Sequence, residues 1–123
     1  MNPFTRALSS RLREQRLQEF VSRWDALEAF VVRIYRAGAV AAQDETEYAR
    51  MRAWLTRHYP AWQATLEPYW RSALRNGERC ERDPFAEILR VPRAAHFVGN
   101  WAAMQTLPAA REALNRLILE RSA

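Results

Sequence analysis

The sequence predicts an all-α fold, an irregular bundle of about five or six helices with one long N-terminal helix. Apolar residues recur at spacings of three and four along the chain, and no segment shows the alternation typical of a strand. Three glycines and six prolines separate these segments, and both residue types mark helix ends and turns. Because 123 residues is the length of one ordinary domain, we expect a single helical domain over residues 1–123.

The first helix is expected to run from about Thr5 to Arg36 and to end or loosen at Gly38. Its second half carries an apolar stripe on one face, so this half should pack on the core. The corresponding stripes of the later helices complete the predicted core. The residues expected to be mostly buried are Phe20, Trp24, Leu27, Val31, Ile34, Leu55, Trp62, Leu66, Trp101, Leu114 and Leu117.

The second helix is expected to open with a capping box formed by Asp44 and Glu47. Its apolar face continues to Tyr59, and Pro60 interrupts it. A third helical segment follows and is expected to end at Asn76-Gly77. Pro68 lies inside that segment, where it either kinks the helix or starts a separate one.

The C-terminal third is expected to contain three helices and no strand. Asp83 and Pro84 form an N-cap and a first-position proline, which predicts a short helix through Leu89. The last two helices are expected at Arg93–Gln105 and Ala109–Arg121.

The residues exclude several classes of catalytic chemistry. P-loops and Schiff-base enzymes need lysine, whereas all 19 basic residues are arginine. There is no G-x-G-x-x-G or G-x-S-x-G motif. Neither His58 nor His96 has a glutamate three residues before it, as di-iron bundles require. We therefore expect a non-catalytic protein with no metal and no cofactor.

Three side chains are candidate reactive or ligand groups. His58 lies at the edge of an apolar face and is a candidate ligand for a haem or pigment, but the favoured interpretation is a half-buried histidine that donates to a backbone carbonyl near Pro60. His96 is interpreted in the same way. Cys80 lies in a charged stretch, residues 77–83, and is expected to face solvent without acting as a nucleophile.

The composition favours a cytoplasmic protein. Cys80 is the only cysteine, and no N-x-[ST] acceptor occurs, so nothing indicates an oxidising compartment. The longest mostly apolar stretch, Ala29 to Ala42, contains Arg33 and Arg36, so we expect no membrane insertion. An alternative is that the N-terminal arginines and serines belong to an organellar transit peptide.

The N-terminal turns carry the feature that most suggests a task. Extending the core stripe backwards by sevens from Phe20 reaches Arg13 and Arg6, and two further arginines lie within about a quarter turn of the same line. Apolar residues of this stretch lie on a different side, so we expect residues 1–18 to project as a basic amphipathic arm. The candidate surface for an anion or a partner is Arg6, Arg13, Arg16 and Arg23.

Three functions are consistent with these features. The leading hypothesis is a non-catalytic helical interaction module, an oligomer or small subunit of a larger assembly, with a protein partner or self-association. The alternative from another class is a nucleic-acid-backbone binder in a nucleoprotein complex that uses the N-terminal arginines. The third is a bundle that binds an apolar or aromatic ligand near His58. A frayed helix end with solvated arginines is the structural alternative to a role for the N-terminal arm.

Overall fold

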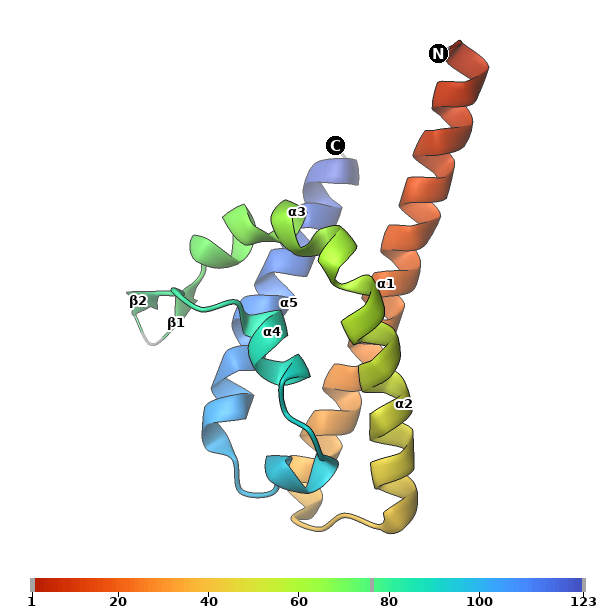
Figure 1. Cartoon of the computed structure of the whole chain (residues 1–123). Helices are drawn as coiled ribbons and strands as arrows, with labels where there is room; N and C mark the ends of the chain where they lie inside the picture. Colours follow the sequence, from red (N-terminus) through yellow and green to blue (C-terminus); the bar gives the residue numbers. More distant parts are fainter. Residues whose placement is uncertain (1, 76, 123) are drawn as a thin grey trace.

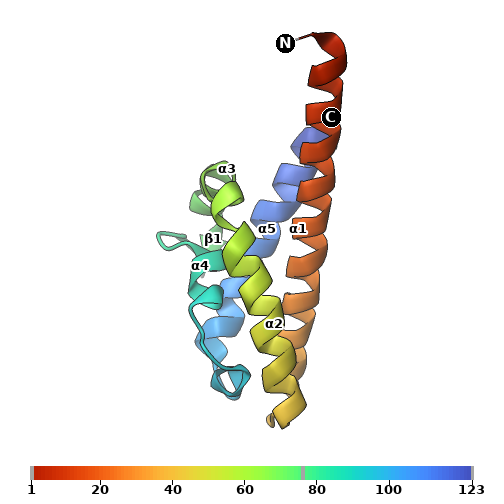
Figure 2. The ribbon, with the colours of Figure 1, turned by 45° about the vertical axis from the view of Figure 1, so that its right-hand side comes forward.

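The part of the chain that the structure describes contains five α-helices, and this confirms the predicted all-α class (Figure 1). The computed structural model describes residues 2–75 and 77–122. The long N-terminal helix α1 is followed by α2, which returns beside it, and by α3, which crosses the end of α2 (Figures 1 and 2). The elements are α1 (Pro3–Ala37), α2 (Ala42–His58), α3 (Pro60–Arg71), β1 (Leu74–Arg75), β2 (Glu78–Arg79), α4 (Pro84–Leu89), the 3₁₀ turn η1 (Ala94–Phe97) and α5 (Trp101–Ser122).

Helix α1 begins two residues earlier than expected because Asn2 caps it. The Asn2 Oδ1 accepts a hydrogen bond from the Thr5 amide at 2.7 Å, and Pro3 occupies the first turn, where its missing N–H costs nothing. The helix ends at Gly38, whose positive φ of 68° closes the last turn as expected.

The core lies between the second half of α1 and the elements packed on it. Every residue expected to be buried is buried except Trp101, which is 60% exposed. That part of the prediction was wrong because residues 93–105 do not form one helix. The 3₁₀ turn η1 and the positive φ of Gly99 break the segment, so Trp101 starts α5 and its ring only lies near Tyr35, with centroids 6.3 Å apart.

Two prolines lie inside helices. The expected break between two C-terminal helices is absent, and α5 is continuous through Pro108. Although an interior proline costs a helix about 3 kcal/mol, buried residues on both sides of Pro108, such as Leu107 and Ala110, pack on the core and hold the two halves in line. Helix α3 likewise continues past Pro68 to Arg71.

A short antiparallel hairpin replaces the expected helix end at Asn76-Gly77. Leu74 pairs with Arg79 in its register, so the expectation that the chain has no strand was wrong. Gly77 has a φ of 81°, and an Asn-Gly pair between two extended segments is a strong hairpin signal. Asn76 itself lies outside the described residues.

The cap of α2 differs from the predicted one by three residues. Ala41 is the N-cap, and Asp44 is the third residue of the helix, where its Oδ2 accepts from the Ala41 amide at 2.9 Å. From this position the Asp44 Oδ1 also accepts from Arg33 of α1 at 3.0 Å. The Ala41 amide and then the Arg33 guanidinium hold the pKa of Asp44 below its ordinary value.

The cap of α4 is the predicted one. The Asp83 carboxylate accepts from the amides of Phe85 and Ala86 at 3.0 and 3.2 Å, and Pro84 is the first helical residue. The same carboxylate accepts from the Tyr59 hydroxyl at 2.6 Å. Asp83 therefore ties the start of α4 to the junction of α2 and α3.

No helix in the described part of the chain has both the length and the apolar character to cross a membrane.

Candidate functional site

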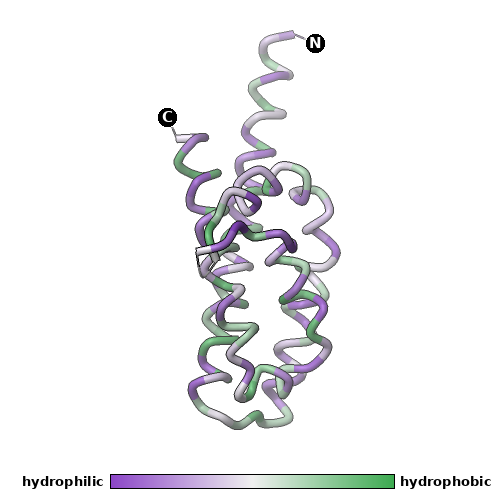
Figure 3. The backbone as a smooth tube through the Cα atoms, turned by 90° about the vertical axis from the view of Figure 1, so that its left-hand side faces the viewer, coloured by the Kyte–Doolittle hydropathy of each residue, from purple (hydrophilic) through white to green (hydrophobic). Residues whose placement is uncertain are grey.

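The first turns of α1 are exposed to solvent along their length. We define residues 2–16 as the N-terminal segment of α1. All of them are exposed, whereas Leu17 and the core stripe behind it are buried. Figures 1 and 2 show this segment extending past the other helices, and Figure 3 shows the ends of α1 and α5 at the same end of the molecule. Its exposed apolar side chains are Phe4, Leu8 and Leu12, at 73%, 45% and 52%.

The four candidate arginines are all exposed, but they differ in what they contact. The Arg13 guanidinium lies 5.9 Å from the centre of the Trp62 ring. The Arg23 guanidinium lies 4.9 Å from the Trp54 ring and 3.9 Å from Glu19. Within residues 2–75 and 77–122, Arg6 and Arg16 have no ring contact or ion pair. The arginines therefore follow α1 from its free end to the middle of the helix, where Trp54 of α2 lies beside it.

Two of these arginines share a groove with His58. We call it the basic-aromatic groove, a hollow of about 780 Å³ between α1 and the junction of α2 with α3. The sequence did not indicate that the arginines and His58 would meet, because they lie more than 40 residues apart. The residues lining the groove are Ser9, Leu12, Arg13, Arg16, Glu19, Trp54, His58, Ala61 and Trp62.

His58 is held by its own helix. Its Nδ1 donates to the Trp54 carbonyl at 2.8 Å, and its ring stacks on the Trp54 ring with centroids 3.9 Å apart. The favoured interpretation, a half-buried histidine bonded to a backbone carbonyl, is confirmed, although the carbonyl is one turn earlier in α2 rather than at the helix end. His96 is exposed instead.

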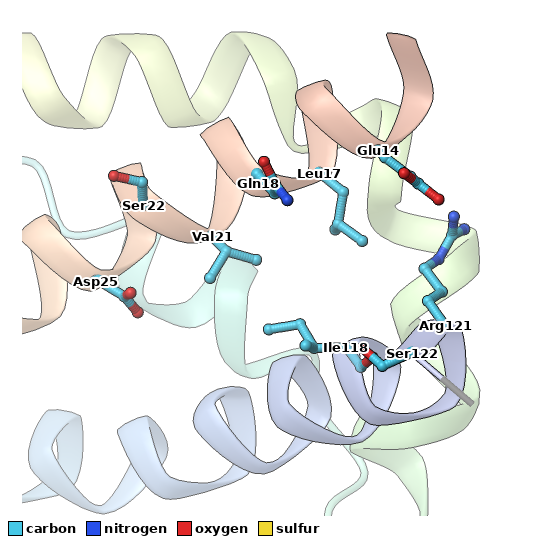
Figure 4. Close-up of a pocket in the computed structure, with 9 residues that line it drawn as sticks. All are labelled: Glu14, Leu17, Gln18, Val21, Ser22, Asp25, Ile118, Arg121 and Ser122. Atoms are coloured by element: carbon cyan, nitrogen blue, oxygen red, sulfur yellow. The ribbon is translucent and has the colours of Figure 1, made fainter. Parts of the chain in front are cut away.

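A second groove lies on another side of α1, against the last turns of α5 (Figure 4). We call this hollow of about 440 Å³ the apolar groove. Leu17 and Val21 of α1 point toward Ile118 of α5, and at one end Glu14 and Arg121 point toward each other (Figure 4). Sequence reasoning missed this groove. The only signal was the i, i+4 pair of Leu17 and Val21 beside the core stripe.

Arg111 of α5 holds the other end of the apolar groove to α1. Its Nη2 donates to Asp25 at 2.5 Å and to Glu28 at 3.0 Å. Asp25 also lines the groove. The two helices are therefore joined at this end and leave an opening toward the N-terminal segment.

Cys80 does not face solvent as expected. Its side chain is 4% exposed, and its thiol donates to the Arg82 carbonyl at 3.1 Å. The chain folds back after β2, so a residue between charged neighbours turns inward. Among residues 2–75 and 77–122, no three histidine, cysteine or acidic side chains gather as metal ligands would.

No protein-family model, curated protein or solved structure matches the chain.

Proposed function

We propose that the protein is a non-catalytic interaction module whose binding element is the N-terminal segment of α1. The observation that carries the proposal is the exposure of every residue from 2 to 16 on a helix whose core-facing side chains are buried from Leu17 onward. An isolated helix of about 12–15 residues is only marginally stable in water. A partner that covers Phe4 and Leu8 would add the tertiary packing that this chain does not supply.

A photocrosslinking amino acid at Leu8 tests this role in cells. We expect a crosslinked product of defined mass, whose second component mass spectrometry identifies. The matched control carries the same group at Gln63, which is also exposed but lies on α3, and should give no such product. The proposal is wrong if position 8 gives no product beyond that of position 63.

The unpaired arginines of the segment favour a second candidate function, binding to a nucleic-acid backbone. Residues 2–16 contain four arginines and one glutamate, a net charge of +3. Within the described residues, Arg6, Arg13 and Arg16 form no ion pair with a carboxylate. Guanidinium groups bind phosphate bidentately, so these three can follow a phosphate backbone.

The salt dependence of binding to duplex DNA tests this second candidate. Each phosphate contact contributes about −0.9 to the slope of log affinity against log salt. Replacing Arg6, Arg13 and Arg16 by glutamine should therefore flatten the slope by about 2.7. A control with the same charge change replaces the exposed Arg50, Arg90 and Arg93. Equal slopes for both triple variants would exclude the N-terminal arginines as the phosphate contacts.

A further inference from the structure

We infer that the partner of the N-terminal segment is a second copy of this chain, and that the two α1 helices pair antiparallel. This inference rests on the proposed function and specifies its partner. It starts from one stripe on α1 that has the alternating three- and four-residue spacing of a helix seam, with three apolar and four polar or charged positions. We call it the lateral stripe, and its residues are Phe4, Ala7, Arg11, Glu14, Gln18, Val21 and Asp25.

The lateral stripe lies on neither the core face nor the arginine face of α1. At 100° per residue it is centred roughly 140° around the helix from Arg6, Arg13 and Arg16. All its residues are exposed except the half-buried Val21. Its second half also forms the α1 wall of the apolar groove (Figure 4). The stripe therefore joins the free N-terminal segment to an open groove on the same helix.

One antiparallel register makes the lateral stripe complementary to itself. It places Phe4 opposite Val21 of the second copy and Arg11 opposite Glu14 of the second copy. The two-fold symmetry repeats each contact. Sliding by one heptad would place Phe4 against Glu14, or Arg11 against Val21. A parallel pair would place Arg11 against Arg11 and Glu14 against Glu14, which like-charge repulsion disfavours.

The same register assigns an occupant to the apolar groove. Phe4 of the second copy lies beside Val21, over the hollow whose other wall is Ile118. In a single copy Phe4 is 73% exposed and Ile118 is 37% exposed, so pairing buries apolar surface on both copies. The paired stretch of each α1 helix, from residue 4 to residue 21, is about 26 Å long at 1.5 Å per residue.

Charge also fits this arrangement. Two segments of net charge +3 would repel if their arginines met. In the inferred dimer Arg11 faces a glutamate, and Arg6, Arg13 and Arg16 point away from the seam. Glu14 also points toward Arg121 of its own chain (Figure 4). Arg11 of the second copy would therefore pair with a carboxylate that already lies at the groove.

A charge swap measured by sedimentation equilibrium on the full chain tests the inferred dimer. The wild type should be dimeric at high concentration. Arg11→Glu and Glu14→Arg should each raise the dimer Kd about tenfold or more. The double variant restores opposite charges across the seam, so its Kd should return to within about threefold of the wild type. Arg50→Glu makes the same charge change at an exposed position on α2, away from the seam, and should leave the Kd unchanged.

Engineered disulfides test the antiparallel register independently of charge. Ala7→Cys with Gln18→Cys should give a covalent dimer under mild oxidation, because these positions are opposite each other in the two copies. Within one chain they are about 16 Å apart along the helix, too far for a disulfide. Ser9→Cys with Gln18→Cys places one cysteine on the opposite side of α1 and should remain monomeric under denaturing electrophoresis.

A monomeric wild type, or a dimer in which neither the charge swap nor the Ala7–Gln18 pair behaves as stated, would overturn the inference. If the crosslinker at Leu8 then captures a different protein, the proposed function stands and only the self-pairing fails. If position 8 captures nothing, both fail.

Discussion

Two leucines on the same helix should differ strongly in how much stability the same substitution removes. Leu27 is fully buried in the core, and Leu12 is 52% exposed in the N-terminal segment. Both lie inside α1, and leucine and alanine have similar helix propensities. Leu27→Ala and Leu12→Ala therefore differ only in the tertiary packing that each removes.

The magnitude follows from burial. Leu27→Ala removes three carbons, worth about 2.4 kcal/mol at about 0.8 kcal/mol for each buried CH₂. A cavity that does not collapse raises the total cost toward about 5 kcal/mol. Leu12→Ala creates no cavity, so the free energy of unfolding should change by less than about 0.5 kcal/mol. Leu12 also lies off the lateral stripe, so this expectation does not depend on the oligomeric state.

Urea unfolding followed by circular dichroism at 222 nm measures both values, because a helical bundle loses most of its signal on unfolding. We expect the midpoint of Leu27→Ala to fall with little change in the slope m. A loss of more than about 1.5 kcal/mol in Leu12→Ala would show that the N-terminal segment packs on the domain. A loss below about 0.5 kcal/mol in Leu27→Ala would refute the assigned core.

Three further predictions concern caps, pH and metal. Asp83→Ala should lower the free energy of unfolding in urea by about 1–3 kcal/mol, because it removes the α4 cap and leaves the Tyr59 hydroxyl without its acceptor. In the Asp83→Ala variant, the further change Tyr59→Phe should lower the free energy of unfolding by less than it does in the wild type. The pKa of folded Asp44 is lowered, so its carboxylate stabilises the fold above the ordinary value of 3.8, and this contribution is lost as the pH falls from there through the lowered pKa. Thermal unfolding of the wild type should therefore lose more stability on acidification than Asp44→Asn, and equal losses would contradict the assigned contacts. Adding a chelator should leave the melting temperature unchanged; a stoichiometric metal whose removal unfolds the chain would refute this.

Local signals in the sequence predicted the features that depend on neighbouring residues. The stripe from Phe20 to Ile34 identified the buried face of α1, because helical spacing alone decides which side chains share a face. Asp83 and Pro84 marked the start of α4 because a cap acts within one turn. The arginines of the N-terminal segment were identified as candidate residues in the same way.

The tertiary structure decided what depends on residues far apart in the chain. Helix α5 passes through Pro108 because buried neighbours on both sides hold it, and Trp101 is exposed because Gly99 turns the chain. The sequence identified Arg13 and His58 separately, but only the return of α2 along α1 brings them into one groove. The apolar groove likewise needs Val21 and Ile118, almost a hundred residues apart, to face each other. Spacing along a helix is set by its own hydrogen bonds, whereas grooves are set by how helices pack, and that is a property of the whole chain.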